Sequence, residues 1–233
     1  DGGGPGTYSQ LLIVREYMTR LAFDQGTDAN ELIPADYFDL MGGVGFGGLA
    51  AFMLGYLRMS VDTAIGTLLS IALLVFPTEP QENTSPDVRM KSLREALENT
   101  IKECGLPLDQ KMVDKGCPAG SCKVCVNIST ALYAATTANV THPQTFRTYP
   151  SRLSKLNPSI VDALCATMAT PRFFSPAKIG PPLRQQSFIG GALGANNPTR
   201  ELLAEAADVF GNDRRVAQII TLGSGRPRMI ALG

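Results

Sequence analysis

Residues 39–48 read Asp-Leu-Met-Gly-Gly-Val-Gly-Phe-Gly-Gly and stand between a short strand-like run and a long apolar, helix-like run. A sharp strand-to-helix turn with the pattern Gly-x-Ser-x-Gly is a nucleophile elbow, in which the serine attacks an ester carbonyl. Here the outer glycines are Gly43 and Gly47, and the residue between them is Gly45. Glycine has no side chain that could attack, so the chain is either a hydrolase of another kind or only the shell of one.

Two more glycine-rich segments carry functional information. Asp1-Gly2-Gly3-Gly4 leads into a predicted helix, and consecutive glycines let backbone N–H groups converge on an anionic spot, as an oxyanion hole requires. An ordinary flexible terminus is the alternative interpretation of this segment. The other segment, residues 188–198, reads as a tight turn followed by an ordered loop and a helix that starts near Thr199.

Helix-like and strand-like segments alternate along the chain and must position these turns. Apolar periodicity predicts helices over residues 8–23, 49–56, 60–76, 88–104, 159–169 and 199–210. Short apolar runs predict strands over 37–41, 123–128, 146–149, 187–189 and 216–222, and the glycine run 42–48 is expected to be a loop. This alternation indicates an α/β fold, a three-layer sandwich around a central, mostly parallel sheet.

Composition favours one large globular domain. The chain has 233 residues, of which 44% are hydrophobic, and 21 basic residues balance 21 acidic ones. Because there is no basic excess, we expect no nucleic-acid partner. The longest uncharged stretch, Leu40 to Leu57, is rich in glycine, and residues 63–76 are too short to cross a bilayer, so both are interpreted as buried helices.

Five cysteines leave two interpretations open. An odd count without a signal peptide favours reduced thiols in the cytosol. Cys104, Cys117, Cys122 and Cys125 could supply four thiols to zinc, but structural zinc sites favour paired Cys-x2-Cys knuckles and the chain has only one such pair. Buried free thiols are the preferred interpretation, and we expect neither a metal ion nor another cofactor.

The order and spacing of these motifs resemble the patatin-like phospholipase family, and its fungal branch in particular. The matching segments cover nearly the whole chain: residues 1–4, 36–43, 57–61, 146–149, 166–174, 193–198 and 213–216. Each motif is short, but their combination in this order is highly specific. The resemblance implies a patatin-like α/β fold related to the elbow architecture of α/β-hydrolases.

The resemblance also implies a serine–aspartate dyad, which this chain does not carry. The family's nucleophile falls on Gly45, and the dyad acid, which acts as the base, falls on Gly190. The amides of Gly2, Gly3 and Gly4 correspond to the oxyanion hole, whose usual arginine is absent from Gly4-Pro5-Gly6-Thr7. The only histidine, His142, lies in an expected loop, so a Ser-His-Asp triad is not available either. We therefore expect a pseudoenzyme that does not hydrolyse esters.

A lipid or fatty-acyl ligand is the partner that the resemblance implies. The groove beside the elbow would be lined by Phe46, Leu49 and Phe52, and the glycine amides near the N-terminus would face a carbonyl or carboxylate. We expect residues 1–233 to form a single patatin-like domain, a fragment of a longer chain that lacks its first strand. Fungal members often stand at the front of proteins with nucleotide-binding and repeat domains. By resemblance we expect a role in lipid metabolism, in the cytoplasm and peripheral to membranes.

Gly43, Gly45 and Gly48 leave one alternative function open. They fit Gly-x-Gly-x-x-Gly after a strand and before a helix, which is the fingerprint of a Rossmann-like dinucleotide-binding domain. That fingerprint also requires a second strand that ends in an acidic residue about twenty residues further on. Asp62 lies at this distance but falls in a predicted helix. Dinucleotide binding is therefore the second candidate.

Overall fold

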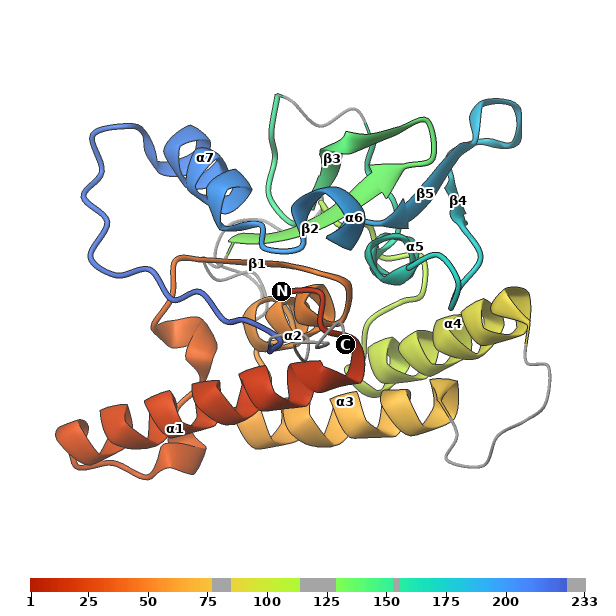
Figure 1. Ribbon diagram of the computed structural model, residues 1–233. Coiled ribbons are helices and arrows are strands. Elements are labelled where there is room, and N and C mark those ends of the chain that lie inside the picture. Colours follow the sequence, from red (N-terminus) through yellow and green to blue (C-terminus); the bar gives the residue numbers. More distant parts are fainter. Residues whose placement is uncertain (77–84, 114–128, 153–155, 226–233) are drawn as a thin grey trace, which may run out of the picture.

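Helices cover both faces of a mixed sheet, which has five strands in the described part of the chain (Figure 1). The structure is a computed structural model that describes residues 1–76, 85–113, 129–152 and 156–225. The strands are β1 (Leu40–Val44), β2 (Ser129–Thr136), β3 (Asn139–Arg147), β4 (Ala177–Ile179) and β5 (Gln186–Gly190). The helices are α1 (Thr7–Gln25), α2 (Gly45–Gly55), α3 (Val61–Val75), α4 (Pro86–Glu103), α5 (Ile160–Met168), α6 (Ala192–Ala195) and α7 (Thr199–Phe210).

Alternating side chains of β2 divide the apolar interior into two layers. Successive residues of a strand point to opposite faces of the sheet. Leu132 and Ala134 therefore join the large cluster formed with α1 to α5, whereas Ala131 and Tyr133 face the other side. The smaller cluster there joins Val44, Ala131 and Tyr133 to the partly buried Ala192 of α6 and Leu202 of α7. The predicted three-layer α/β sandwich is thus confirmed.

Only one pair of neighbouring strands in the described sheet is parallel, so the prediction of a mostly parallel sheet was wrong. β1 pairs with β2 in parallel, whereas β2–β3, β2–β5 and β4–β5 are antiparallel pairs. Short connections explain the β2–β3 and β4–β5 pairs, because strands joined by a tight hairpin run in opposite directions. The sequence reading missed β2 and β4, and it assigned residues 141–143 to a loop although they lie in β3.

The register along β2 brings two other strands end to end. β3 pairs with β2 between Ala131 and Thr136 and occupies one edge of it. β1 pairs with the first half of β2, as far as Tyr133, and β5 pairs with the second half, from Ala134 onward. Because β3 lies opposite both, β1 and β5 must share the other edge of β2. Their carboxyl ends therefore meet at one point of the sheet.

Serine caps start three helices where the sequence predicts a helix start. The hydroxyl oxygens of Ser60, Ser85 and Ser159 accept hydrogen bonds from backbone N–H groups in the first turns of α3, α4 and α5. Such a cap contributes about 1 kcal/mol to the stability of a helix. The helices predicted over 60–76, 88–104, 159–169 and 199–210 are confirmed within two residues at each end.

Residues 216–222 do not form the predicted final strand. They have no regular secondary structure, and Val216, Ile219 and Ile220 are exposed. A strand is stable only when its backbone pairs with a neighbour, and no described strand pairs with this segment. Strand propensity alone was therefore a misleading signal here. The strand predicted over 123–128 lies outside the described residues.

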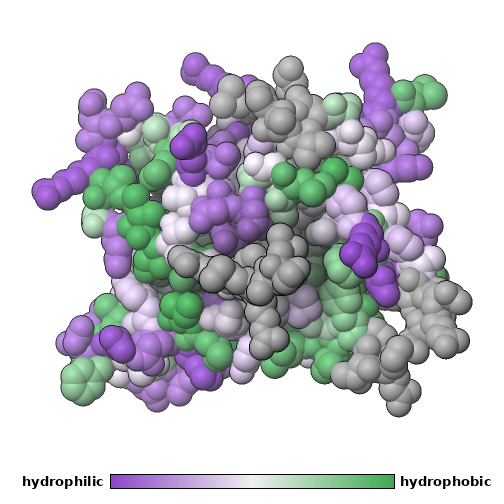
Figure 2. Space-filling view, in the orientation of Figure 1, coloured by the Kyte–Doolittle hydropathy of each residue, from purple (hydrophilic) through white to green (hydrophobic). Residues whose placement is uncertain are grey.

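The two long apolar segments differ in their burial. Every residue of α2 is buried, as predicted. The prediction of a buried helix over residues 63–76 was wrong for one side of α3, where Leu69, Leu73 and Leu74 are exposed. Figure 2 shows hydrophobic surface over this part of the molecule, at its lower edge. Among the described helices, none has the length and apolar character needed to cross a membrane.

Candidate functional site

β1 passes directly into α2 at Gly45, without the loop predicted over 42–48. Val44 is extended, with φ −125° and ψ 140°, and Gly45 follows with a φ of +58°. This left-handed backbone conformation costs a residue with a side chain about 1–2 kcal/mol, whereas glycine adopts it freely. The chain thus changes from strand to helix within one residue, which is the geometry of a nucleophile elbow.

The outer glycines of this turn are required by close backbone contacts, and the middle one is not. A Cβ atom built on Gly43 would lie 2.5 Å from the carbonyl oxygen of Gly47. A Cβ built on Gly47 would lie 2.2 Å from the carbonyl oxygen of Asp1. On Gly45, however, the nearest atom would be the Cα of Gly2 at 3.5 Å, an ordinary contact. The turn therefore has space for a side chain at its centre, and the sequence does not supply one.

Gly190, at the predicted position of the dyad acid, ends β5 beside the elbow. Val44 is paired with Tyr133 of β2, and Gly190 is paired with the next residue, Ala134. Cβ atoms built on Gly45 and Gly190 would lie 3.8 and 3.1 Å from the carbonyl oxygen of Thr167, so they are separated by at most the sum, about 6.9 Å. A hydroxyl and a carboxylate at these positions could therefore reach hydrogen-bond distance of each other.

Thr167 at the end of α5 connects the elbow to β2. Its Oγ1 accepts a hydrogen bond of 2.9 Å from the N–H of Gly45 and donates one of 2.6 Å to the carbonyl of Tyr133. The side chain is fully buried, so this hydroxyl is committed to holding the turn. Thr170 lies next to the other position, since its Oγ1 would be 3.1 Å from a Cβ on Gly190.

The N-terminal glycine segment packs directly against the elbow. Its Gly2 is the residue nearest to a side chain built on Gly45. The N–H of Gly3 donates to the carbonyl of Asp1 at 3.0 Å, and the N–H of Gly4 donates to the carbonyl of Gly2 at 2.9 Å. Two of the three predicted oxyanion donors thus make hydrogen bonds within the segment, and only Gly2 keeps an amide with no acceptor among the described residues.

The predicted acyl-binding residues Phe46, Leu49 and Phe52 lie in the main core, with exposed fractions of 4%, 1% and 0%. They therefore do not line an open groove beside the elbow. Phe46 follows the elbow directly, and its ring centroid lies 6.2 Å from that of Phe76. Phe76 in turn contacts Phe173, with centroids 6.1 Å apart, and Phe173 is 44% exposed. A row of three aromatic rings therefore connects the elbow with the protein surface.

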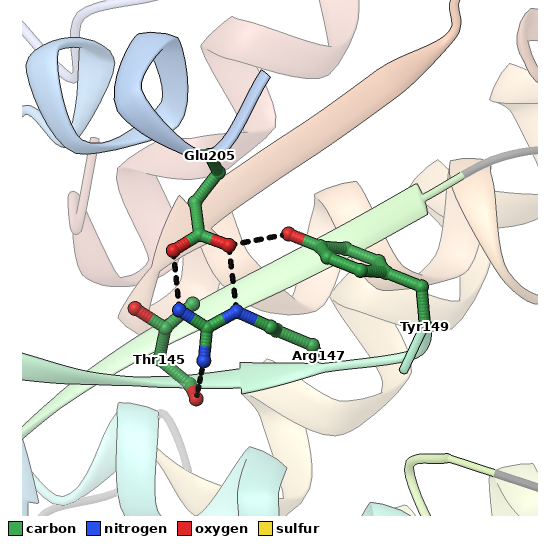
Figure 3. A network of polar contacts seen from close by, with 4 residues as sticks. All are labelled: Thr145, Arg147, Tyr149 and Glu205. Atoms are coloured by element: carbon green, nitrogen blue, oxygen red, sulfur yellow. Dashed lines mark hydrogen bonds and ion pairs between the residues drawn. The ribbon is translucent and has the colours of Figure 1, made fainter. Parts of the chain in front are cut away.

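A buried ion pair fixes α7 on the sheet beside this site (Figure 3). The carboxylate of Glu205 accepts two hydrogen bonds from the guanidinium of Arg147, one of them 2.6 Å long, and a third from the hydroxyl of Tyr149 at 2.6 Å. Burial and the Glu205 carboxylate raise the pKa of Tyr149. Burial alone would lower the pKa of Arg147, but the hydrogen bond and charge of Glu205 raise it.

This network gives the Phe-Arg-Thr-Tyr motif a structural role that sequence reasoning missed. Arg147 and Tyr149 stand two residues apart, a spacing that puts side chains on one face of an extended chain. That spacing was the available signal. Its acidic partner, Glu205, lies 58 residues beyond Arg147 and was not predictable from local pattern.

The two described cysteines differ in their exposure. Cys104 is exposed, which corrects the expectation that it is buried, and Cys165 is buried in α5. Cys117, Cys122 and Cys125 lie outside the described residues. In the part of the chain that the structure describes, no three His, Cys, Asp or Glu side chains gather closely enough to hold a metal ion. Burial raises the pKa of the Cys165 thiol to about 12.

The structure does not favour a dinucleotide at Gly43, Gly45 and Gly48. In the described chain, α2 is followed by α3 and α4, and the next strand is β2 at Ser129, so the unit of about thirty residues that the fingerprint requires is not formed. Asp62 lies in the first turn of α3, with its carboxylate 3.5 Å from Arg15. Asp1 also packs on Gly47 in the first turn of α2, where a pyrophosphate would have to bind.

Fold and turn together define an α/β protein with a nucleophile-elbow architecture. The family model described as patatin-like phospholipase matches residues 1–203, and the chain belongs to this family. A search of curated proteins finds no match. The family acts on lipids, which supports both a lipid acyl hydrolase ancestry and a lipid ligand for this chain.

Proposed function

We propose that this domain binds acyl lipids at a former catalytic centre and does not hydrolyse their esters. The observation that carries the proposal is Gly45 at the middle of an otherwise complete elbow. The outer glycines, the positive φ and the space for a side chain are all kept, while the nucleophile is missing. Gly190 supports the same interpretation, because it pairs with Ala134 of β2, next to the residue that pairs with Val44 at the elbow.

Removal of the nucleophile is expected to abolish measurable turnover, since it costs on the order of a millionfold in a well-studied hydrolase. The nearby hydroxyl of Thr167 does not replace it, because that hydroxyl is buried and engaged on both sides. Thr170 lies beside Gly190, but a threonine there has no carboxylate at position 190 to act as its base. The site therefore keeps binding elements and lacks reacting groups.

We propose that the acyl chain lies along the aromatic row of Phe46, Phe76 and Phe173. Phe46 and the neighbouring Leu49 and Phe52 are packed in the core, so a chain enters by separating Phe76 from Phe46. The lipid carbonyl or carboxylate then faces the Gly2 amide, which has no acceptor among the described residues. A peripheral, cytoplasmic location, an origin in the fungal branch and additional domains in a longer chain stay predictions.

Thermal-shift titration with fatty acids and lysophospholipids below their micellar concentrations tests the proposal. We expect the wild-type protein to be stabilised, and Phe173→Ala, an exposed end of the row, to weaken binding severalfold. Phe23→Ala serves as the matched control, because Phe23 is 85% exposed on α1, away from the row. No stabilisation by any of these ligands contradicts binding, and release of fatty acid from a lysophospholipid by the wild-type protein contradicts the loss of catalysis.

A further inference from the structure

Residues 163–200 form a stretch without acidic residues in a chain whose total charges balance. This stretch carries four basic residues, Arg172, Lys178, Arg184 and Arg200, and no acidic residue. All four side chains are exposed. All 21 acidic residues lie elsewhere in the chain, so this stretch is basic in sequence although the net charge of the chain is zero.

The connection between β4 and β5 presents an apolar residue at the centre of this basic stretch. The two antiparallel strands project from the body of the molecule, and the segment that connects them is the part of the hairpin farthest from that body (Figure 1). Leu183 lies in this connection and is 98% exposed, directly before Arg184. Figure 2 shows hydrophobic and hydrophilic residues side by side where the hairpin projects, at the upper right. A leucine so exposed contributes nothing to the core.

A second apolar and basic pair lies at the turn before β4. Arg172 is exposed with a φ of 79°, and the adjacent Phe173 is 44% exposed. The backbone N–H of Phe173 donates to the carbonyl of Thr170, the residue that packs beside Gly190. Through Phe76, Phe173 also leads to the elbow. This exposed pair is therefore continuous with the proposed acyl-binding row.

We propose that the β4–β5 hairpin and the turn before it form a docking surface for membranes rich in anionic lipids. This basic hairpin surface consists of Arg172, Phe173, Lys178, Leu183 and Arg184. Its cations complement negatively charged head groups, and its two exposed apolar side chains insert among the acyl chains. One part of the inference rests on the proposed function: a lipid from the docked membrane enters the aromatic row at Phe173.

Exposed apolar side chains distinguish a lipid surface from other anionic partners. A site for a phosphate backbone uses cations and polar groups, and an aliphatic side chain that is 98% exposed adds nothing to it. In a bilayer, by contrast, insertion of Leu183 and Phe173 removes apolar area from water while the neighbouring cations stay at the head groups.

Co-sedimentation with vesicles tests the docking surface. We expect the protein to bind vesicles of phosphatidylcholine with phosphatidylserine, to bind pure phosphatidylcholine much more weakly, and to dissociate as salt is raised. Leu183→Ser and Arg184→Glu should each lower the bound fraction severalfold. The matched controls on α1 are Ile13→Ser, at a residue that is 52% exposed, and Arg20→Glu, and both should bind like the wild-type protein.

Three outcomes overturn the docking surface: no binding to anionic vesicles, loss of binding that is equal in the α1 controls, or preferential binding of a duplex oligonucleotide through Arg184.

The lysophospholipid titration separates this inference from the proposed function. Leu183→Ser should bind monomeric lysophospholipid as the wild-type protein does. Ligand binding without vesicle binding refutes only the docking surface, and vesicle binding without ligand binding refutes only the acyl site.

Discussion

Replacing the elbow glycines one at a time should show that Gly43 is required for packing and that Gly45 stands at a vacant catalytic position. In Gly45→Ala the new Cβ meets only ordinary contacts, the nearest at 3.5 Å, so the cost is the left-handed backbone, about 1–2 kcal/mol. In Gly43→Ala the new Cβ would stand 2.5 to 2.7 Å from three backbone atoms of Gly47 and Gly48 in the first turn of α2. Backbone cannot rotate away, so we expect a loss above about 3 kcal/mol.

Urea unfolding measures this difference as a shift in midpoint at constant m value. In thermal unfolding, Gly45→Ala should lower Tm by about 2–8 °C for a domain of this size, and Gly43→Ala should lower it further or prevent folding. Gly45→Ser should resemble Gly45→Ala. The reasoning is refuted if Gly45→Ala is as damaging as Gly43→Ala, since position 45 would then be a glycine for packing reasons.

Three other perturbations follow from the same geometry. Glu205→Gln leaves the Arg147 guanidinium buried without its counter-charge and should cost about 3–5 kcal/mol in urea unfolding; a loss below 1 kcal/mol would show that water replaces the partner. The raised pKa of Cys165, about 12, means that the unfolded thiol ionises from about pH 9 while the folded one stays protonated, so stability should fall as pH rises from 9 to 12. Cys165→Ala should flatten that fall by up to about 1.4 kcal/mol per pH unit, and an unchanged slope would contradict the burial of the thiol. Gly190→Asp should destabilise the fold, because its Cβ would lie 3.1 Å from the Thr167 carbonyl oxygen and Thr170 Oγ1, and adding Thr170→Ala should recover part of the loss; no recovery would place the strain elsewhere.

Local pattern was sufficient for the helices and for the family. Serine followed by an apolar period predicted the starts of α3 and α5, because capping and amphipathic burial are decided by residues close in sequence. The motif order between residues 1 and 216 was enough to recognise the patatin-like family, which the match over residues 1–203 confirms.

Long-range pairing explains what the sequence did not predict. β2 contains three alanines in Ser129–Thr136 and was not recognised as a strand, but its pairing with β1, β3 and β5 makes it one. Residues 216–222 have the composition of a strand but pair with no described strand. Strand propensity is decided by neighbours, so both errors have one cause.

The candidate site itself is a product of pairing. The sequence marked Gly45 and Gly190 separately, by motif, but their proximity depends on β1 and β5 following each other along β2 at Tyr133 and Ala134. Local pattern predicted a loop over 42–48, although the strand passes directly into the helix. The hydrogen bond from the Gly45 amide to Thr167 was not predictable from the sequence. Motifs identified the parts, and only the register of the sheet shows that they meet.

An ester-hydrolysis assay with a soluble chromogenic acyl ester tests the central claim most directly. The proteins to compare are the wild type, Gly45→Ser, Gly190→Asp, the double variant, and the double variant with Thr170→Ala to relieve the contact at position 190. We predict background rates for the wild type and both single variants, and turnover in a variant that carries both groups. Hydrolysis by the wild-type protein, or a folded double variant that stays at background with and without Thr170→Ala, would contradict the assignment of these two glycines to a lost dyad.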